Sequence, residues 1–358
     1  MNPAVIAKSA RNLLSAVEIR VNRRLGREFI PPRDMLLIET SSLCNLKCRF
    51  CAYEKKHSPR VSMRDEFFAD CVTQALDLGY RRFELTPCTG DVFMDRHLFN
   101  KLAFLDRNPT VQGYQFFTNF TIPKHADIER LIGLEKLERL TISVYGHDCA
   151  SFVAMTKSTE KVYARLISNL ETLHKALPRR RFVLEIGFRT TRHLPRAAPS
   201  DLMKLLRRFE RAGINVRPTG VYNNWGGFIS NADVEGLGID VTSTERMYKN
   251  GACSLLLTTV QVMANGIVNG CGCRDVDATL RIGDLKVTPL REIMSARNPT
   301  YMGLIEEQQR GEFRPVCRGC DFYKSIYHVR AKDRRRGAKF QTLAEFKASL
   351  DAPRTERA

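Results

Sequence analysis

The sequence lacks long apolar runs. No stretch of about 18 apolar residues occurs in the chain, so no transmembrane helix is predicted. The first twenty residues contain no uninterrupted apolar run of signal-peptide length. These absences predict a cytoplasmic protein.

Internal repeats and low-complexity blocks are also missing, which excludes a solenoid architecture. Hydrophobic content of 43% and charged content of 27% are ordinary for a folded protein. A chain of 358 residues can bury one large core and a smaller appendage.

The net charge of +18 is concentrated at the two ends of the chain. Residues 1–35 carry seven Lys/Arg against three Asp/Glu, and residues 324–358 carry ten against four. Such an excess can attract nucleic acid, an anionic lipid surface or an anionic substrate, with residues 334–336 (three arginines) as candidates for gripping phosphate. Solvated surface and basic tails are the alternative interpretation.

Residues 4–25 are predicted to form a basic amphipathic helix. Its apolar side chains recur every three or four residues, at Ile6, Ala10, Leu13, Val17, Val21 and Leu25. The opposite face carries Arg11, Ser15, Glu18 and Asn22. Such a helix can lie on a membrane surface, or its apolar face can pack against its own domain.

Strand and helix patterns alternate from residue 35 onward. The expected strands are Met35–Thr40, Phe83–Pro87, Tyr114–Asn119, Leu140–Tyr145, Phe182–Thr190 and Ile214–Thr219. Helical patterns separate them at 64–79, 94–107, 124–136, 158–176 and 199–212. Six successive β/α units predict a parallel sheet with right-handed crossovers. Because six units are too few for a closed eight-stranded barrel, we expect an α/β fold with an open, partial (β/α)6 TIM-like barrel whose chemistry lies in the loops after the strands.

The pattern changes after about residue 230. Cysteines follow at residues 253, 271, 273, 317 and 320, and a short hairpin is predicted at Thr258–Val268 with Asn265–Gly266 as its turn. So little apolar sequence predicts a small metal-stapled subdomain. The expected organisation is an N-terminal helix (1–34), the barrel (35–230), the cysteine-rich subdomain (231–328) and a basic tail (329–358).

Eleven cysteines are many for a cytoplasmic protein, where thiols serve metals or redox chemistry more often than disulfides. Cys44, Cys48 and Cys51 form a C-x3-C-x2-C loop directly after the first expected strand. Three thiolates can hold one cuboidal iron–sulfur cluster and leave its fourth iron open. Zinc is the rival metal, but a closed structural zinc site needs four ligands, and the nearest further candidate is His57.

This loop resembles the signature of the radical S-adenosylmethionine (SAM) superfamily, C-x3-C-x-aromatic-C, with Phe50 at the aromatic position that packs near the adenine of SAM. The resemblance covers roughly residues 35–220, and it implies the same partial barrel with a [4Fe–4S] cluster on Cys44, Cys48 and Cys51. Gly90 and Asp91 match in part the family's Gly-Gly-Glu, which contacts the SAM amino group. The other positions that resemble family contacts to SAM are Asn119, Ser143 and Arg189.

The later cysteines resemble the SPASM and twitch extensions of the same superfamily. Twelve residues separate Cys253 from Gly266 and four separate Gly266 from Cys271, and Cys317 and Cys320 follow much later. The likeness implies one auxiliary [4Fe–4S] cluster held by Cys253, Cys271, Cys317 and Cys320. Cys273 is the alternative to Cys271, and a four-cysteine zinc site is the alternative metal centre.

The resemblance implies reductive cleavage of SAM, with a flavodoxin or ferredoxin as electron donor, and hydrogen abstraction from a biosynthetic carbohydrate or peptide. Residues 222–227 are expected at the barrel mouth, where substrate enters. The alternative function is that of an RNA-modifying radical SAM enzyme, or of a nucleic-acid-binding iron–sulfur protein that uses the basic ends.

Overall fold

Six parallel strands form the centre of the computed structural model, which describes residues 3–191, 200–244, 247–329 and 339–352 (for 3–11, the backbone only). The strands pair in chain order: β1 (Met35–Ile38), β2 (Arg82–Glu84), β3 (Gly113–Thr118), β4 (Leu137–Tyr145), β5 (Val183–Arg189) and β6 (Asn215–Thr219). The predicted partial (β/α)6 barrel is therefore confirmed. The three arginines at 334–336 lie outside the described residues.

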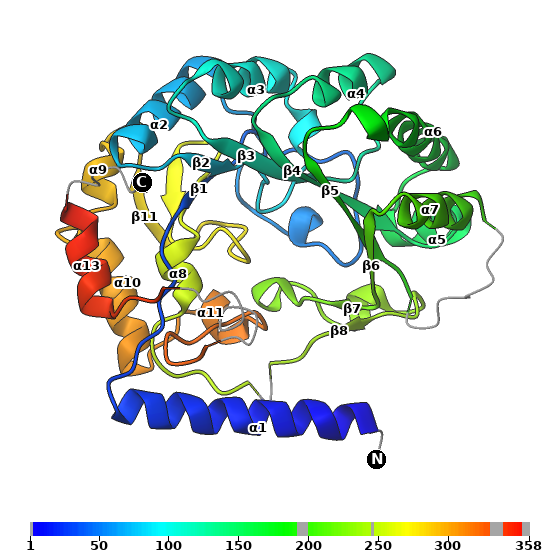
Figure 1. Cartoon of the computed structure of the whole chain (residues 1–358). Helices are drawn as coiled ribbons and strands as arrows, with labels where there is room; N and C mark the ends of the chain where they lie inside the picture. Colours follow the sequence, from blue (N-terminus) through cyan, green and yellow to red (C-terminus); the bar gives the residue numbers. More distant parts are fainter. Residues whose placement is uncertain (1–2, 192–199, 245–246, 330–338, 353–358) are drawn as a thin grey trace.

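Helices cover the outer face of this curved sheet, as Figure 1 shows. They are α2 (Asp65–Asp77), α3 (Leu98–Arg107), α4 (His125–Ile132), α5 (Cys149–Thr156), α6 (Glu160–Ala176) and α7 (Asp201–Arg211). The sequence patterns predicted all of them except α5. Because side chains alternate along a strand, Leu140, Ile142 and Val144 of β4 are fully buried on one face, while Ser143 and Tyr145 line the inner cavity. The core thus lies between sheet and helices, and the inner face is free for chemistry.

Three further strands extend the sheet beyond β1. They are β9 (Gln261–Val262), β10 (Ile267–Asn269) and β11 (Arg281–Asp284). The predicted hairpin is present as β9 and β10, with Gly266 at φ +92° in its turn. However, β9 also pairs in parallel with β1, so the hairpin continues the barrel sheet. A separate pair, β7 (Val221–Tyr222) and β8 (Asp240–Val241), lies beyond β6.

The remaining helices follow β8 in the sequence. They are α8 (Ser254–Thr258), α9 (Leu290–Ile293), α10 (Pro299–Arg310), α11 (Pro315–Gly319) and α13 (Leu343–Asp351). Phe346 and Leu350 of α13 are buried, so part of the segment expected as a basic tail is a packed helix. A backbone bridge between Ile30 and Gln341 holds this segment beside the start of the barrel.

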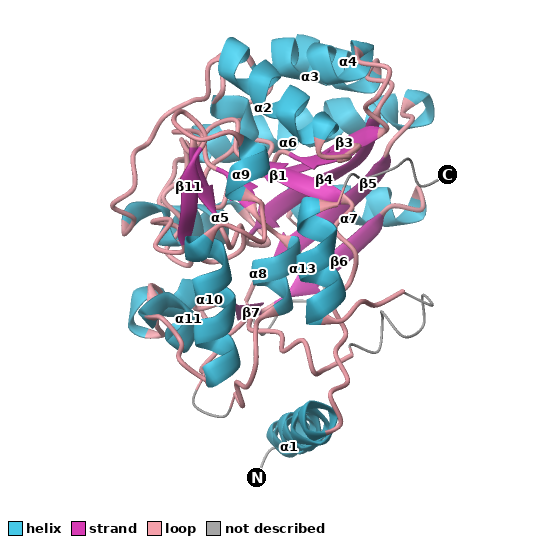
Figure 2. Cartoon of the chain, turned by 90° about the vertical axis from the view of Figure 1, so that its left-hand side faces the viewer, coloured by secondary structure: helices cyan, strands magenta, loops and turns pink. Residues whose placement is uncertain are grey.

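Helix α1 (Pro3–Arg24) lies at one end of the molecule, set apart from the barrel (Figure 2). Two placements of its apolar face were predicted, on a membrane surface or against the protein's own domain, and the described residues do not show the second. Val17 and Val21 are each 48% exposed, whereas Ala16, Ile19 and the polar Asn22 are buried. The reason is that polar contacts hold the inner side: the Asn22 side-chain amide donates to the Tyr327 carbonyl at 2.9 Å. No helix in the described part of the chain has the length and apolar character needed to cross a membrane.

Candidate functional site

The loop after β1 brings Cys44, Cys48 and Cys51 to the carboxyl end of the strand. The Cys51 N–H donates to the Cys48 carbonyl at 3.0 Å, which folds the loop back on itself. The N–H groups of Lys47 and Arg49 donate to carbonyls at the end of α5, each at 3.0 Å. The helix that the sequence patterns missed therefore supports the cysteine loop.

Burial dominates the chemistry of these three thiols. It raises the pKa of each. The Asp91 carboxylate and then the Cys51 thiolate raise the pKa of Cys44 further, and the thiolates of Cys51 and Cys44 do so for Cys48. The cation of Arg189 offsets part of this rise at Cys48 and Cys51. Among the described residues, no group of three or more His, Cys, Asp or Glu side chains is placed to hold a single metal ion. The donor set of three free thiols in one cavity fits an iron–sulfur cluster, whose positive charge would offset the repulsion between thiolates.

A cavity of about 620 Å³ opens on the inner face of the sheet above these thiols. It is lined by all nine residues predicted to hold the first cluster and SAM: Cys44, Cys48, Phe50, Cys51, Gly90, Asp91, Asn119, Ser143 and Arg189. These residues come from five β/α units, so the sheet assembles them from distant parts of the sequence. Their shared cavity is the central geometric finding at this site.

Phe50 forms an aromatic wall of this cavity. Its ring centroid lies 5.1 Å from that of Tyr145 and 4.8 Å from that of Tyr222. The indole N–H of Trp225 donates to the Phe50 carbonyl at 2.9 Å. The segment predicted at the barrel mouth, residues 222–227, therefore contacts the cysteine loop.

Gly90 lies where the loop after β2 touches the backbone before Cys44. Its φ is +144°, and a Cβ there would lie 2.9 Å from the Leu43 carbonyl oxygen and 3.0 Å from that of Ser41. The Asp91 N–H donates to the same Leu43 oxygen at 2.7 Å. Only glycine fits this position without displacing the backbone around it.

The Asp91 carboxylate joins the loop after β2 to the end of β3. It accepts hydrogen bonds from the N–H groups of Phe93 (3.0 Å) and Asn119 (2.7 Å) and from the Thr118 hydroxyl. Burial raises its pKa to about 6, although these hydrogen bonds favour the ionised form. Asp91 thus lines the cavity while also holding the loop.

Asn119 and Arg189 approach the cysteine loop from other strands. The Asn119 amide donates to the Asn45 side chain at 3.0 Å and lies 3.9 Å from the Cys44 sulfur. Arg189 pairs with Tyr145 in the β4–β5 register, which places its cation beside the aromatic wall.

The second cysteine group lines a separate small cavity of about 30 Å³. It comprises Cys253, Cys271, Cys273, Cys317 and Cys320. N–H groups of Gln308, Phe322 and Lys324 lie 3.3, 3.2 and 3.4 Å from the sulfurs of Cys317, Cys320 and Cys253, respectively. Such donors stabilise thiolates and tune iron–sulfur potentials.

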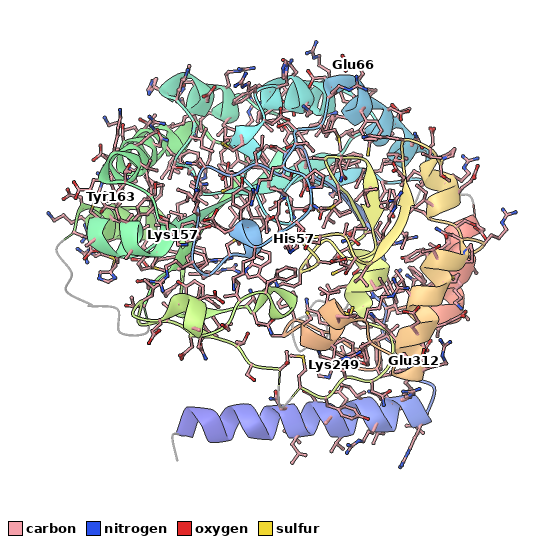
Figure 3. The ribbon with its side chains drawn as sticks, turned by 180° about the vertical axis from the view of Figure 1, so that it is seen from behind. His57, Glu66, Lys157, Tyr163, Lys249 and Glu312 are labelled. Atoms are coloured by element: carbon pink, nitrogen blue, oxygen red, sulfur yellow. The ribbon has the colours of Figure 1, made fainter. Side chains whose placement is uncertain are left out.

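Lys249, labelled in Figure 3, anchors the turn that carries the last two cysteines. Its ammonium donates to the carbonyls of Cys317, Arg318 and Cys320 at 2.6 to 2.7 Å. Three carbonyl contacts from one cation give this turn a fixed shape.

Cys273 and Arg274 line both cavities, so they lie between the two cysteine groups. The Arg274 guanidinium stands 5.0 Å from the Trp225 ring centroid and 4.6 Å from that of Phe322. Sequence reasoning missed Arg274, although its place directly after Cys271-Gly-Cys273 was an available signal.

Sequence reasoning also missed Glu39, which follows the apolar β1 strand directly. Its buried carboxyl accepts from the N–H groups of Cys88 (3.3 Å) and Ala264 (3.2 Å), so it joins the loop after β2 to the hairpin. Burial raises the pKa of Glu39, and the nearby Lys56 cation lowers it in part. An acid at the end of an apolar strand is the signal that could have identified it.

No family model and no curated protein sequence matches the chain. Solved structures do resemble it. BtrN in complex with AdoMet and 2-DOIA has a TM-score of 0.52 at 12% identity, with 82% of this chain and 95% of BtrN covered. SuiB of Streptococcus suis bound to precursor peptide SuiA has a TM-score of 0.53 at 14% identity, with 91% of this chain and 78% of SuiB covered. Histidine-tagged anSMEcpe with bound AdoMet has a TM-score of 0.52 at 14% identity, with 89% of this chain and 92% of anSMEcpe covered. The chain therefore shares the fold of these three proteins, which agrees with the partial barrel that the first cysteine motif implies.

Proposed function

We propose that this protein is a radical SAM enzyme whose first cluster is held by Cys44, Cys48 and Cys51. The observation that carries the proposal is the single cavity lined by these thiols and by the six predicted SAM-contact residues. When bound, a [4Fe–4S] cluster supplies an electron that cleaves SAM to methionine and a 5′-deoxyadenosyl radical. A flavodoxin or ferredoxin is the expected electron donor.

The chain's own residues bind and orient the cofactor. The Arg189 guanidinium suits the SAM carboxylate, because its planar fork can bond both oxygens. Asp91 would hold the ammonium of SAM, and the Phe50 ring, packed against Tyr145 and Tyr222, would offer an apolar surface to the adenine. Buried walls around these groups exclude water from the reacting atoms.

The second cysteine group is proposed to hold an auxiliary [4Fe–4S] cluster on Cys253, Cys271, Cys317 and Cys320. Support comes from the N–H donors near three of these sulfurs. Cys271 lines the same cavity as Cys273 and Cys253; burial raises the pKa of its thiol, and these two neighbouring thiolates raise it further. Cys273 remains the alternative ligand, because it also lines this cavity.

The proposed substrate is a carbohydrate or peptide that enters the inner cavity. SuiB, which shares this fold, is described with a precursor peptide bound, which supports the peptide alternative; BtrN is described with 2-DOIA. Glu84 and Gln115, joined by a hydrogen bond of 2.6 Å, offer polar contacts on the cavity wall. Such groups suit a substrate rich in hydroxyl or amide groups.

The test is anaerobic reconstitution followed by incubation with dithionite and SAM. We expect 5′-deoxyadenosine and about eight irons per chain for two clusters. Cys44→Ala should abolish the nucleoside product, whereas Cys320→Ala should reduce the iron to about four and retain cleavage. Cys149→Ala, outside both cavities, is the matched control. Nucleoside formation by Cys44→Ala would contradict the proposal.

A further inference from the structure

Helix α1 presents a row of apolar side chains to the outside of the molecule. The row, here called the outer face of α1, consists of Leu13, Leu14, Val17, Val21 and Leu25. Exposed fractions run from 48% for the two valines to 68% for Leu14. Nine large hydrophobic side chains are exposed in the described part of the chain, and five of them belong to this one row. Clustering of this kind marks an interaction surface.

The inner side of α1 is fastened to the protein, so the row cannot turn inward. Ala16 and Ile19 are buried, and Glu18 lies 2.8 Å from the ring of His328. The Arg20 guanidinium stands 4.6 Å from the Tyr248 ring centroid. Side chains on the other side of the helix project away from the protein in Figure 3. The outer face is therefore held in a fixed, outward orientation.

The charges around the outer face are of one sign. Between residues 12 and 27 the exposed charged side chains are Arg20, Arg23, Arg24 and Arg27. Arg20 stacks on Tyr248, and Arg23 donates to the Asn250 side chain and the Gln309 carbonyl, so both reach back to the protein. The arginines beside the outer face are therefore Arg24 and Arg27. Glu18 is the acidic residue in this range, and it faces His328 on the inner side. A second copy of the chain would bring these arginines against their counterparts, which like-charge repulsion opposes. An anionic surface with an apolar interior would attract the arginines and would bury the leucines away from water.

We propose that α1 docks the protein on an anionic lipid bilayer. The leucines and valines of the outer face enter the boundary between headgroups and acyl chains, while Arg24 and Arg27 contact lipid phosphates. Helix α1 lies in the plane of the surface, held by the contacts that fasten its inner side. This role is independent of the proposed SAM chemistry, because none of these residues lines the catalytic cavity.

The test is co-sedimentation of the reconstituted full chain with vesicles. Binding is expected to vesicles of equal parts phosphatidylcholine and phosphatidylglycerol, and not to phosphatidylcholine alone. The Val17→Asp/Val21→Asp double variant should weaken vesicle binding at least about tenfold, because two apolar side chains that enter the bilayer are replaced by carboxylates. Val287→Asp, at a valine that is 82% exposed outside α1, is the matched control and should bind like the wild type.

The charge contribution is tested separately. Arg24→Glu/Arg27→Glu should reduce binding, and the same change of charge on α6, Lys161→Glu/Arg165→Glu, should reduce it much less. Circular dichroism checks that each variant is folded. The proposal is overturned if the wild type fails to sediment with anionic vesicles or if the valine variant still binds. A concentration-dependent dimer that the valine variant abolishes would assign the face to a second copy instead, and would also overturn it.

Discussion

Replacing Gly90 by alanine should displace the loop that carries Cys44. The added Cβ would stand 2.9 Å from the Leu43 oxygen, 3.0 Å from the Ser41 oxygen and 3.1 Å from the Ser42 carbonyl carbon. All three are backbone atoms, so no side chain can rotate away. The Ser42 N–H is itself bonded to the Val61 carbonyl at 2.9 Å, which keeps this backbone in place.

Two effects add at this position. A φ of +144° is a glycine conformation, and forcing alanine into it costs about 1–3 kcal/mol. Crowding against fixed atoms costs typically about 1–3 kcal/mol more. The free energy of unfolding should therefore fall by roughly 2–6 kcal/mol, a large part of a typical stability of about 5–15 kcal/mol.

Gly311→Ala is the matched control. Gly311 ends α10 with φ +87°, and no described atom lies within 4 Å of its added Cβ. The free energy of unfolding of this variant should fall only by the cost of placing alanine in the left-handed conformation, about 1–2 kcal/mol. Urea unfolding of the reduced proteins measures both variants, and iron content reports whether the cysteine loop still assembles. Equal unfolding midpoints for the two variants would refute the reasoning.

Three further predictions concern buried charges. Burial raises the pKa of Asp91 from 3.8 to about 6, so the folded chain keeps a proton that the unfolded chain loses in this interval. The resulting contribution to the free energy of unfolding is fully present below pH 3.8 and is lost as pH rises through 6. It amounts to on the order of 3 kcal/mol. The Asp91→Asn variant should lose this pH dependence when urea unfolding is measured at pH 4 and pH 7. Lys101→Met leaves the buried Asp95 unpaired and should cost about 3–5 kcal/mol in thermal unfolding, against about 0.5 for the exposed Lys204→Met. Lys249→Met removes three carbonyl contacts and should reduce iron from about eight to about four per chain while SAM cleavage continues.

For each of these predictions, one outcome would contradict the reasoning. An unchanged pH profile in the Asp91 variant would show that another group sets it. Similar losses in the two lysine variants, 101 and 204, would mean that burial does not govern the ion pair. Full iron in the Lys249 variant would show that the last cysteine turn holds its shape without the ammonium.

The order of the barrel elements follows from local sequence patterns. Runs of apolar and β-branched residues predicted all six strands, and five of the six covering helices came from their 3.6-residue period. Helix α5 was missed, since its eight residues are apolar around most of their circumference and show little periodicity. The Cys44–Cys51 motif was found because its ligand spacing is contained in one loop.

The sequence by itself determined the order of the barrel strands and the cysteine loop after β1, since short-range periodicity and spacing encode them. Only the tertiary structure decided that β9 joins β1, that Arg274 stands between the two cysteine groups, and that the leucines of α1 face outward. The physical reason is that these outcomes depend on contacts between residues far apart in the chain. A helical period reveals that an apolar face exists, but only the packing partners decide which face they cover.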